Sequence, residues 1–280
     1  MKIRDKFRAG KNQKLDEDDA GVITLGAGAK GGDKKLSAAD VKALDRAQTL
    51  ALTEQIAVCQ AMLYAQRRQK VLLVLQGMDT AGKDGAISAM FNNINPMGVR
   101  AVAFKAPTDF ELAHDYLWRV HQKVPVRGEI AIFNRSHYED VLVTRVHELI
   151  DEKECKRRYA QIRDFERMLT ETGTVIVKVF LHISKEEQRE RLQERLDDPA
   201  KQWKFDPNDV VQRKSWDDYQ RAYELAIRET DADHAPWYVV PANSKTQRNL
   251  VVASLLLETM ESLELRFPEP DPGLSALVIV

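Results

Sequence analysis

The sequence contains few cysteines, no long hydrophobic run and almost no net charge. Its two cysteines, Cys59 and Cys155, are far apart and lack metal-site spacing, so we expect free thiols in a reducing compartment. The sequence has no uninterrupted run of about 18 apolar residues, the length that a membrane-spanning helix needs. The N-terminal segment also lacks the apolar core of a signal peptide. We therefore predict a soluble cytoplasmic protein that does not bind membranes.

The charge balance argues against a protein that binds nucleic acids through a basic surface. The chain has 42 Lys and Arg against 43 Asp and Glu, a net charge of −1. Dedicated nucleic-acid binders carry an excess of positive charge. Any anion site must therefore be local. With 44% hydrophobic residues, the 280-residue chain suffices for one large α/β domain.

The most informative motif is VLLVLQGMDTAGKDG, residues 71–85. A strand-like apolar run leads into Gly77, Gly82 and Lys83 at the spacing of a phosphate-binding loop, GxxxxGK, and a helix-like segment follows. The loop N–H groups, the helix N-terminus and the lysine together favour a bound polyphosphate anion. Asp84 stands where such loops usually carry Ser or Thr.

Two carboxylates accompany this loop. Asp79 lies inside it, where a negative charge suits phosphate only if a divalent cation bridges the two groups. An Asx turn is the alternative for Asp79. For Asp84, we favour a helix N-terminal carboxylate stabilised by the helix dipole.

Strand-like and helix-like segments alternate along the chain. Further strands are expected at 99–104, 129–133, 174–181 and 237–240. Helices are expected at 37–70, 110–122, 152–172, 184–196 and 208–230, the first of them packed beside the first strand. This alternation predicts an α/β fold with a parallel sheet, helices on both faces and ligands at the carboxyl ends of the strands.

We expect one domain at residues 38–265, between a polar, glycine-rich arm at 1–37 and a tail at 266–280. The most unusual part of the arm is GAGAKGGDKK, residues 26–35. A flexible loop is favoured there, and an accessory loop that contacts phosphate is the alternative.

A second candidate cluster follows the strand at 129–133. Asn134, Arg135, Glu139 and Asp140 lie at its carboxyl end, where ligands gather. The Arg135 fork suits phosphate, while Glu139 and Asp140 can bind a metal or accept a proton. A solvated helix start is the alternative interpretation.

Residues 189–209 form a third concentration of charge. Arg191 and Arg195 are four residues apart on one helix face, and Lys201 and Lys204 follow a proline turn. A solvated charged helix is one interpretation. In a chain with a phosphate loop, the pattern also resembles the mobile lid of small kinases.

Four segments together resemble the family-2 polyphosphate kinases, which are polyphosphate:nucleotide phosphotransferases. They are GMDTAGKDG, FKAPTDFELAHDYLWRVH, GEIAIFNRSHYEDVLVTRV and DDPAKQWKFDPNDVVQRKSWDDYQRAY, and the similarity extends over residues 40–265. The resemblance implies a three-layer α/β/α P-loop kinase fold similar to thymidylate kinase, with a helical lid at about 189–210. It also implies Mg²⁺ dependence, with Mn²⁺ as a substitute, and reversible phosphoryl transfer between polyphosphate and nucleotides.

The resemblance also assigns roles by position. It makes Asp79, Lys83, Arg135, Glu139, Asp140 and Arg195 catalytic, with Asp79 and Asp140 as metal ligands. Polyphosphate would contact Gly77, Gly82, Lys83, Lys105, Arg119, Arg145, Arg191, Lys201 and Lys204. The nucleotide would contact Asn134 and Asp209.

One departure from the family pattern bears on the substrate. Asn134 stands where many relatives have a strand-end Asp, and Asp140 follows as a replacement metal ligand. This pattern resembles the subgroup that phosphorylates both AMP and ADP. We also expect a homo-oligomer, a dimer or tetramer. The alternatives are an ATP-dependent nucleoside or nucleotide kinase and an inert polyphosphate or nucleotide sensor.

Overall fold

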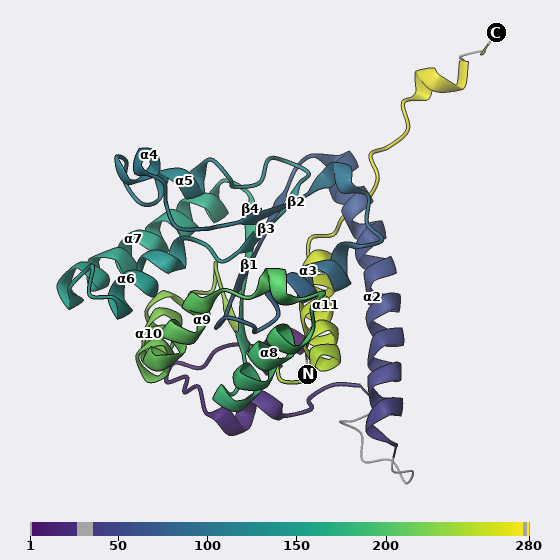
Figure 1. Ribbon diagram of the computed structural model, residues 1–280. Helices are drawn as coiled ribbons and strands as arrows, with labels where there is room; N and C mark the ends of the chain where they lie inside the picture. Colours follow the sequence, from purple (N-terminus) through teal and green to yellow (C-terminus); the bar gives the residue numbers. More distant parts are fainter. Residues whose placement is uncertain (1, 27–35, 277–278, 280) are drawn as a thin grey trace.

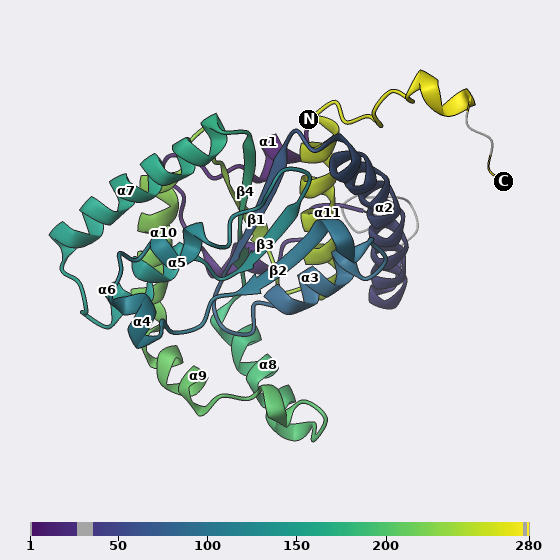
Figure 2. The ribbon, with the colours of Figure 1, turned by 90° about the horizontal axis from the view of Figure 1, so that it is seen from above.

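The protein is a three-layer α/β/α structure around one parallel sheet. The computed structural model describes residues 2–26, 36–276 and 279. Five strands form the sheet in the order β2-β3-β1-β4-β5, and all neighbours are parallel. Figures 1 and 2 show helices on both faces of this sheet. The predicted fold class is confirmed.

All five predicted strands are present. They are β1 (Lys70–Gln76), β2 (Val99–Ala103), β3 (Ile130–Asn134), β4 (Thr174–His182) and β5 (Trp237–Pro241). The apolar side chains of β1 and β3 are 1% exposed or less, which explains why their sequences are unbroken apolar runs. Because β1 lies between β3 and β4, the segment that follows β1 sits where the strand order reverses, a position at which ligands of α/β proteins bind.

The long helices cover the two faces of the sheet. Figure 2 shows α7 (Glu152–Glu171) and α10 (Trp216–Thr230) on one side, and α2 (Ala38–Gln66), α3 (Lys83–Phe91) and α11 (Lys245–Glu261) on the other. A capping box formed by Ser37 and Asp40 starts α2. The prediction that α2 packs beside the first strand is wrong, because α11 is the main neighbour of α2 and lies between it and the sheet.

Two predicted helices are interrupted. The helix expected at 110–122 is two short ones, α4 (Asp109–Leu112) and α5 (Trp118–His121). They are separated because the Asp115 carboxylate accepts hydrogen bonds from the N–H groups of residues 117 and 118 and starts a new turn.

The region expected as one helix at 208–230 is also broken, into α9 (Pro207–Gln212), a 3₁₀ turn η5 (Arg213–Ser215) and α10. With α8 (Lys185–Asp197) and the 3₁₀ turn η4 (Gln202–Lys204), α9 forms a projection at the carboxyl end of the sheet (Figure 2). Shorter connecting elements are η2 (Pro96–Gly98), η3 (His137–Asp140) and α6 (Val143–Val146).

The described part of the N-terminal segment packs against the domain. It contains α1 (Ile3–Phe7) and the 3₁₀ turn η1 (Glu17–Gly21). Arg8 pairs with Asp231 at 2.9 Å, and His182 Nε2 lies 2.6 Å from the Asp16 carbonyl oxygen. The arm predicted for this segment is therefore wrong for these residues, because ion pairs and a few buried apolar side chains hold a polar sequence in place. Residues 27–35, most of the glycine-rich segment, lie outside the described part of the chain.

The C-terminal residues leave the domain after α11. They run outward to a short 3₁₀ turn, η6 (Pro272–Ala276), well separated from the sheet in Figure 1. Among the described helices, none is long and apolar enough to cross a membrane.

A buried polar cluster joins β4 to α7 and α10. Lys178 Nζ lies 2.6 Å from Glu166 Oε2, and the two side chains are at most 1% exposed. Lys178 also donates to the Tyr138 hydroxyl and to the Thr230 carbonyl, each at 2.9 Å. His137 Nε2 lies 3.2 Å from Glu166 Oε1 and so takes part in the same cluster. The cluster holds η3 and the end of β3 in place.

Replacing Glu166 by leucine is expected to lower the free energy of unfolding by about 3–5 kcal/mol, because Lys178 then remains as a buried charge without its partner. Urea unfolding measures the effect. The double variant Glu166→Leu/Lys178→Met is the control and should regain most of the loss, since neither charge remains. A single variant within about 1 kcal/mol of the wild type would contradict this account.

Candidate active site

The phosphate loop connects β1 to α3 at the carboxyl edge of the sheet. Gly77 has a φ of 152°, and a Cβ there would lie 2.7 Å from the Leu181 carbonyl oxygen, so only glycine fits between β1 and β4. Thr80 has a φ of 64° although it is not glycine. Such strained backbone is common at ligand sites. The loop predicted from the sequence is confirmed.

Lys83 opens α3 and folds back under the loop. Its Nζ atom donates to the carbonyl oxygens of Gly77 at 2.7 Å and Met78 at 3.2 Å. The side chain is buried, and burial together with the positive charge of Arg135 lowers the pKa of Lys83. A phosphate anion bound at the loop would offset both the burial of the Lys83 charge and its repulsion by Arg135.

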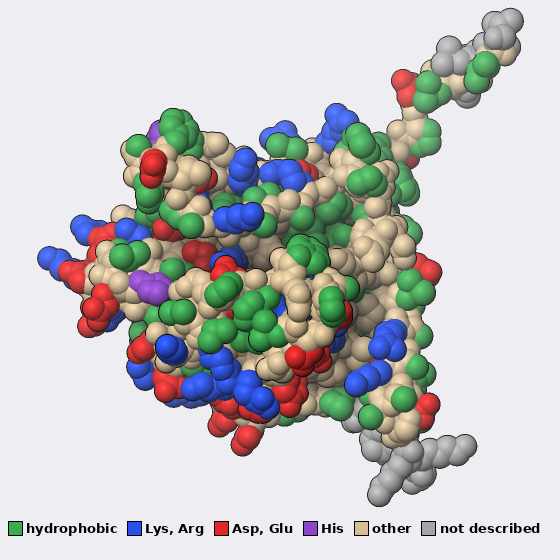
Figure 3. Space-filling model, viewed as in Figure 1, with side chains coloured by type: hydrophobic (Ala, Val, Ile, Leu, Met, Phe, Trp, Pro, Cys, Tyr) green, Lys and Arg blue, Asp and Glu red, His purple; other side chains and the backbone are tan. Residues whose placement is uncertain are grey.

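A cavity of about 700 Å³ lies beside the loop. Its walls come from the phosphate loop, the segments after β2 and β3, and α7, α9 and α10. Figure 3 shows the hollow on the face that carries the carboxyl ends of the strands, with basic and acidic side chains around it. The charged residues predicted for the site that line it are Asp79, Lys105, Arg119, Arg135, Glu139, Asp140 and Asp209.

An ion pair connects the loop to the end of β3. Arg135 Nη2 lies 2.6 Å from Asp79 Oδ1. Arg135 follows β3 directly and has a φ of 61°, a second strained residue at this edge. Burial raises the pKa of Glu139, and Asp79 adds to this effect, whereas Arg135 and Lys83 oppose it.

A second pair lies at the other side of the cavity. Arg158 Nη1 donates to the Asp140 carbonyl oxygen at 3.0 Å and lies 3.9 Å from the Asp140 carboxylate. Burial raises the pKa of Asp140 to about 6, although Arg119 and Arg158 oppose the shift. Arg119, which is 7% exposed, donates to the Lys105 carbonyl oxygen at 2.8 Å.

Other predicted residues lie elsewhere. Arg145, on α6, does not line the cavity, and Lys201 pairs with Asp198 on the surface. Arg191 is buried and donates to the carbonyl oxygens of Thr80, Ala242 and Asn243. Its predicted contact with polyphosphate is wrong for this arrangement, because backbone groups already occupy its donors.

Two predicted residues occupy the edge of the site. Asn134 Nδ2 donates to the Asp84 carboxylate, so the strand-end amide and the first turn of α3 are joined. Gly82, the N-cap of α3, has a φ of 93°. The predicted contacts of Asn134 with the nucleotide and of Gly82 with phosphate remain predictions.

The helical projection reaches the cavity through α9. Arg195 Nη1 lies 3.3 Å from Asp209 Oδ2 and donates to the Lys204 carbonyl oxygen at 3.2 Å. The Lys204 ammonium lies over the Trp203 ring, 4.9 Å from its centroid. Asp209 lines the cavity, so movement of α8 and α9 would carry these charges toward or away from a bound ligand.

The pKa of the Asp209 carboxyl predicts that the stability of the protein depends on pH. Burial, with the negative charge of Asp79, raises its pKa to about 6. Because the folded state holds this proton to higher pH than the unfolded state, the stability it confers is lost as the pH rises from about 4 to about 6. Asp209→Asn should therefore gain stability relative to the wild type between about pH 4 and about pH 7.5, measured by urea unfolding. Parallel pH curves for the two proteins would contradict this.

The charged side chains that line the cavity fit a divalent cation that is held partly by protein carboxylates and partly by the phosphates of the substrate. Seven carboxylates and four Lys or Arg side chains line the cavity, a balance that repels a polyanion unless cations are added. In the described part of the chain, no group of three or more His, Cys, Asp or Glu side chains is arranged to hold a metal. This is compatible with Mg²⁺, which is usually bound by one or two carboxylates together with phosphates and water.

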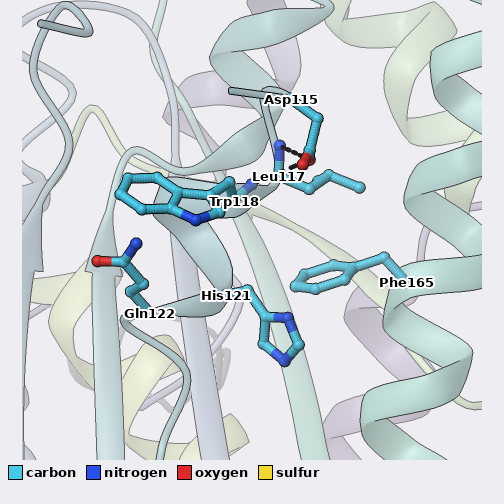
Figure 4. A pocket seen from close by; sticks show the side chains of 6 residues that line it. All are labelled: Asp115, Leu117, Trp118, His121, Gln122 and Phe165. Atoms are coloured by element: carbon cyan, nitrogen blue, oxygen red, sulfur yellow. Dashed lines mark hydrogen bonds between the residues drawn. The ribbon is translucent and has the colours of Figure 1, made fainter. Parts of the chain in front are cut away.

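A smaller pocket of about 350 Å³ lies between α5 and α7. Figure 4 shows Trp118, His121 and Phe165 around it, with Asp115 bonded to the backbone of its own turn. No Lys or Arg lines this pocket, so it is unsuited to a phosphate chain.

Sequence reasoning missed several residues of the site, including the cavity carboxylates Glu111, Asp115 and Asp206 and one side chain on each of three helices. Arg158 lines the cavity from α7, a helix with so many charged residues that the sequence does not distinguish this one. Gln188, on α8, donates to the Asp79 carbonyl oxygen at 3.1 Å. Arg248, on α11, donates to the Ala81 carbonyl oxygen at 3.3 Å. No local motif marks any of the three.

The chain is similar in sequence and fold to known proteins. Residues 40–268 match the family described as Polyphosphate kinase 2 (PPK2). An AMP/ADP-polyphosphate phosphotransferase of Meiothermus ruber is 55% identical over 228 residues, 81% of this chain and 85% of that protein. An ADP-polyphosphate phosphotransferase of Rhodopseudomonas palustris is 45% identical over 232 residues, 79% of this chain and 80% of that protein. A crystal structure of polyphosphate kinase 2 from Arthrobacter aurescens TC1 superposes with a TM-score of 0.89 at 43% identity, covering 99% of this chain and 95% of that chain.

Proposed function

The chain belongs to the polyphosphate kinase 2 family, and from this we propose that it transfers phosphoryl groups between inorganic polyphosphate and nucleotides at the cavity beside the phosphate loop. The observation that carries the proposal is the convergence there of the loop, the β3 end and α9. The cavity of about 700 Å³ carries Lys105, Arg119, Arg135 and Arg158 on its walls, and these cations, together with a divalent metal, suit a phosphate chain.

The proposed reaction is an in-line transfer. An oxygen of the nucleotide's terminal phosphate forms a bond to the end phosphorus of polyphosphate, and the bond from that phosphorus to its bridging oxygen breaks. The shortened polyphosphate leaves with the electron pair, and no proton has to move. Lys83, Arg135 and Arg195 would offset the repulsion between the two anions and align them.

When bound, Mg²⁺, with Mn²⁺ as a substitute, would supply positive charge against the negative charge of the phosphates. We propose Asp79 and Asp140 as its protein ligands, because both carboxylates line the cavity and each lies close enough to Glu139 for the negative charges to repel. The ion pair with Arg135 at 2.6 Å would hold the Asp79 carboxylate in place at the cavity wall.

We further propose that both AMP and ADP are acceptors. The similarity to the Meiothermus ruber protein, whose name states both, supports this. Asn134 in place of a strand-end carboxylate, with Asp140 nearby in the chain, is the feature of this sequence that fits the same conclusion. AMP would then be converted to ATP by two successive transfers.

The cellular setting is also a proposal. Two free cysteines, Cys59 and Cys155, fit the reducing cytoplasm. A homo-oligomer is supported by exposed apolar side chains on the outer side of α2, including Leu44, Leu50 and Val58.

Donor choice tests the function. The purified protein is incubated with Mg²⁺ and either polyphosphate plus ADP or ATP plus a nucleoside or nucleoside monophosphate, and products are separated by chromatography. ATP made from polyphosphate and ADP is the expected result. Reaction only with ATP as donor would instead show a nucleoside or nucleotide kinase. Binding of polyphosphate with no product in any mixture would show an inert sensor.

A further inference from the structure

Two buried arginines lie behind the phosphate loop. Arg191 extends from α8 and Arg248 from α11, and they are 5% and 4% exposed. Arg191 Nη1 donates to the Thr80 carbonyl oxygen at 2.8 Å, and Arg248 Nη1 donates to the Ala81 carbonyl oxygen at 3.3 Å. Two successive carbonyl groups of the loop are thus fixed by side chains from helices remote in sequence.

The Arg248 guanidinium lies directly against the start of α3. A Cβ at Gly82 would lie 1.8 Å from Arg248 Nη1, and a Cβ at Gly85 would lie 3.0 Å from Nη2. Gly85 has no positive φ, so its backbone alone does not require glycine. The contact with Arg248 supplies a reason for glycine at both positions.

The charges of the two arginines are balanced differently. Arg191 pairs with Glu187 at 2.7 Å. Arg248 bonds to the Asn249 side-chain oxygen through Nη2 at 2.8 Å and Nε at 3.1 Å, and no carboxylate in the described ranges forms an ion pair with it. Burial, together with the charge of Arg191, lowers the pKa of Arg248 to about 10, so it remains cationic at neutral pH.

A buried cation without a counter-charge is costly in the empty protein. Here it lies beside the N-terminus of α3, which is also electropositive, and on the far side of the loop from the cavity. An anion held by the loop would provide the missing negative charge from the other side. The arrangement therefore favours the bound state over the empty one.

We propose that Arg248 is a positioning residue that holds the phosphate loop from behind and strengthens its binding of the polyphosphate anion through an unneutralised buried charge. The inference rests on the proposed function. It assigns Arg248 to binding of the donor, so its loss should raise the KM for polyphosphate more than it lowers kcat.

The test measures binding of inorganic tripolyphosphate with Mg²⁺ by calorimetry, and kcat and KM with polyphosphate and ADP. We expect Arg248→Met to bind tripolyphosphate at least about ten-fold more weakly and to raise KM by a similar factor, whereas Arg248→Lys regains part of the loss because it keeps the charge. Arg163→Met is the matched control, because Arg163 donates to the Glu229 carbonyl oxygen away from the cavity.

Each outcome is decisive. If the wild type does not bind tripolyphosphate, the proposed function fails; if it binds and Arg248→Met has the same affinity and KM, only this inference fails. Equal losses in Arg248→Lys and Arg248→Met would contradict the role of charge.

A second variant covers the case in which Arg248→Met does not fold. Gly85→Ala then decides, because its methyl group displaces the guanidinium without removing it. Several-fold weaker binding is expected there, and unchanged affinity overturns the inference.

Discussion

Replacement of Lys83 by alanine is expected to lower kcat by about 10²–10³-fold while the protein remains folded. The Lys83 ammonium is buried under the loop, within hydrogen-bond distance of the Gly77 and Met78 carbonyl oxygens. Its positive charge would stabilise the negative charge on the phosphoryl group during transfer. Steady-state kinetics with polyphosphate and ADP measures the effect.

Lys156→Ala is the matched control for this variant, because Lys156 lies on the surface of α7 and pairs with Glu152. Its kcat should equal that of the wild type. Thermal unfolding of Lys83→Ala must accompany the kinetics, since two loop carbonyl groups lose a donor. A folded Lys83→Ala protein with kcat within a few-fold of the wild type would contradict the assignment of this loop as the transfer site.

Asp79→Asn is expected to lower kcat by about 10²-fold or more and to increase the Mg²⁺ concentration needed for half-maximal rate. The substitution keeps the size of the side chain and its ability to form an Asx turn, but it removes the negative charge that pairs with Arg135 at 2.6 Å. It therefore separates the two interpretations of Asp79. If the residue only stabilised the loop as an Asx turn, the variant would keep its activity.

The control for Asp79→Asn is Asp84→Asn, which removes a carboxylate from the same segment. Asp84 is exposed, lies in the first turn of α3 and accepts a hydrogen bond from Asn134. A change in rate of no more than a few-fold is expected. An Mg²⁺ titration that is the same for Asp79→Asn and the wild type would rule out Asp79 as a metal ligand.

The sheet and the phosphate loop could be predicted because their signals are local. Buried parallel strands must be apolar along their length, as Val71 to Leu75 are, and the loop needs glycine at fixed positions such as Gly77. Strand order has no such signal, because it is set by which helices pack across the sheet. The break between α4 and α5 depends on one Asp115 side chain bonding to its own turn, which a helical pattern does not reveal.

From the residue pattern alone, the candidate site could be predicted where its residues follow a strand, whereas Arg119 on α5 and Asp209 on α9 are assigned only through the family resemblance. Asp79, Arg135 and Asp140 come from the ends of β1 and β3, whose parallel pairing brings them together. Arg158 and Arg248 come from helices, where each is one of many charged residues, and only the packing of these helices directs them to the cavity or the loop. Arg191 is the converse case, because the sequence pattern predicts a contact with phosphate whereas its donors bond to backbone carbonyl groups.

The most direct test of the account is a time course with polyphosphate, Mg²⁺ and AMP, with no ATP added. The account predicts that ADP appears first and ATP follows, with the phosphate gained by the nucleotides equal to that lost from the polyphosphate. No ADP or ATP from AMP, and none from ADP under the same conditions, would contradict polyphosphate-dependent transfer at this site.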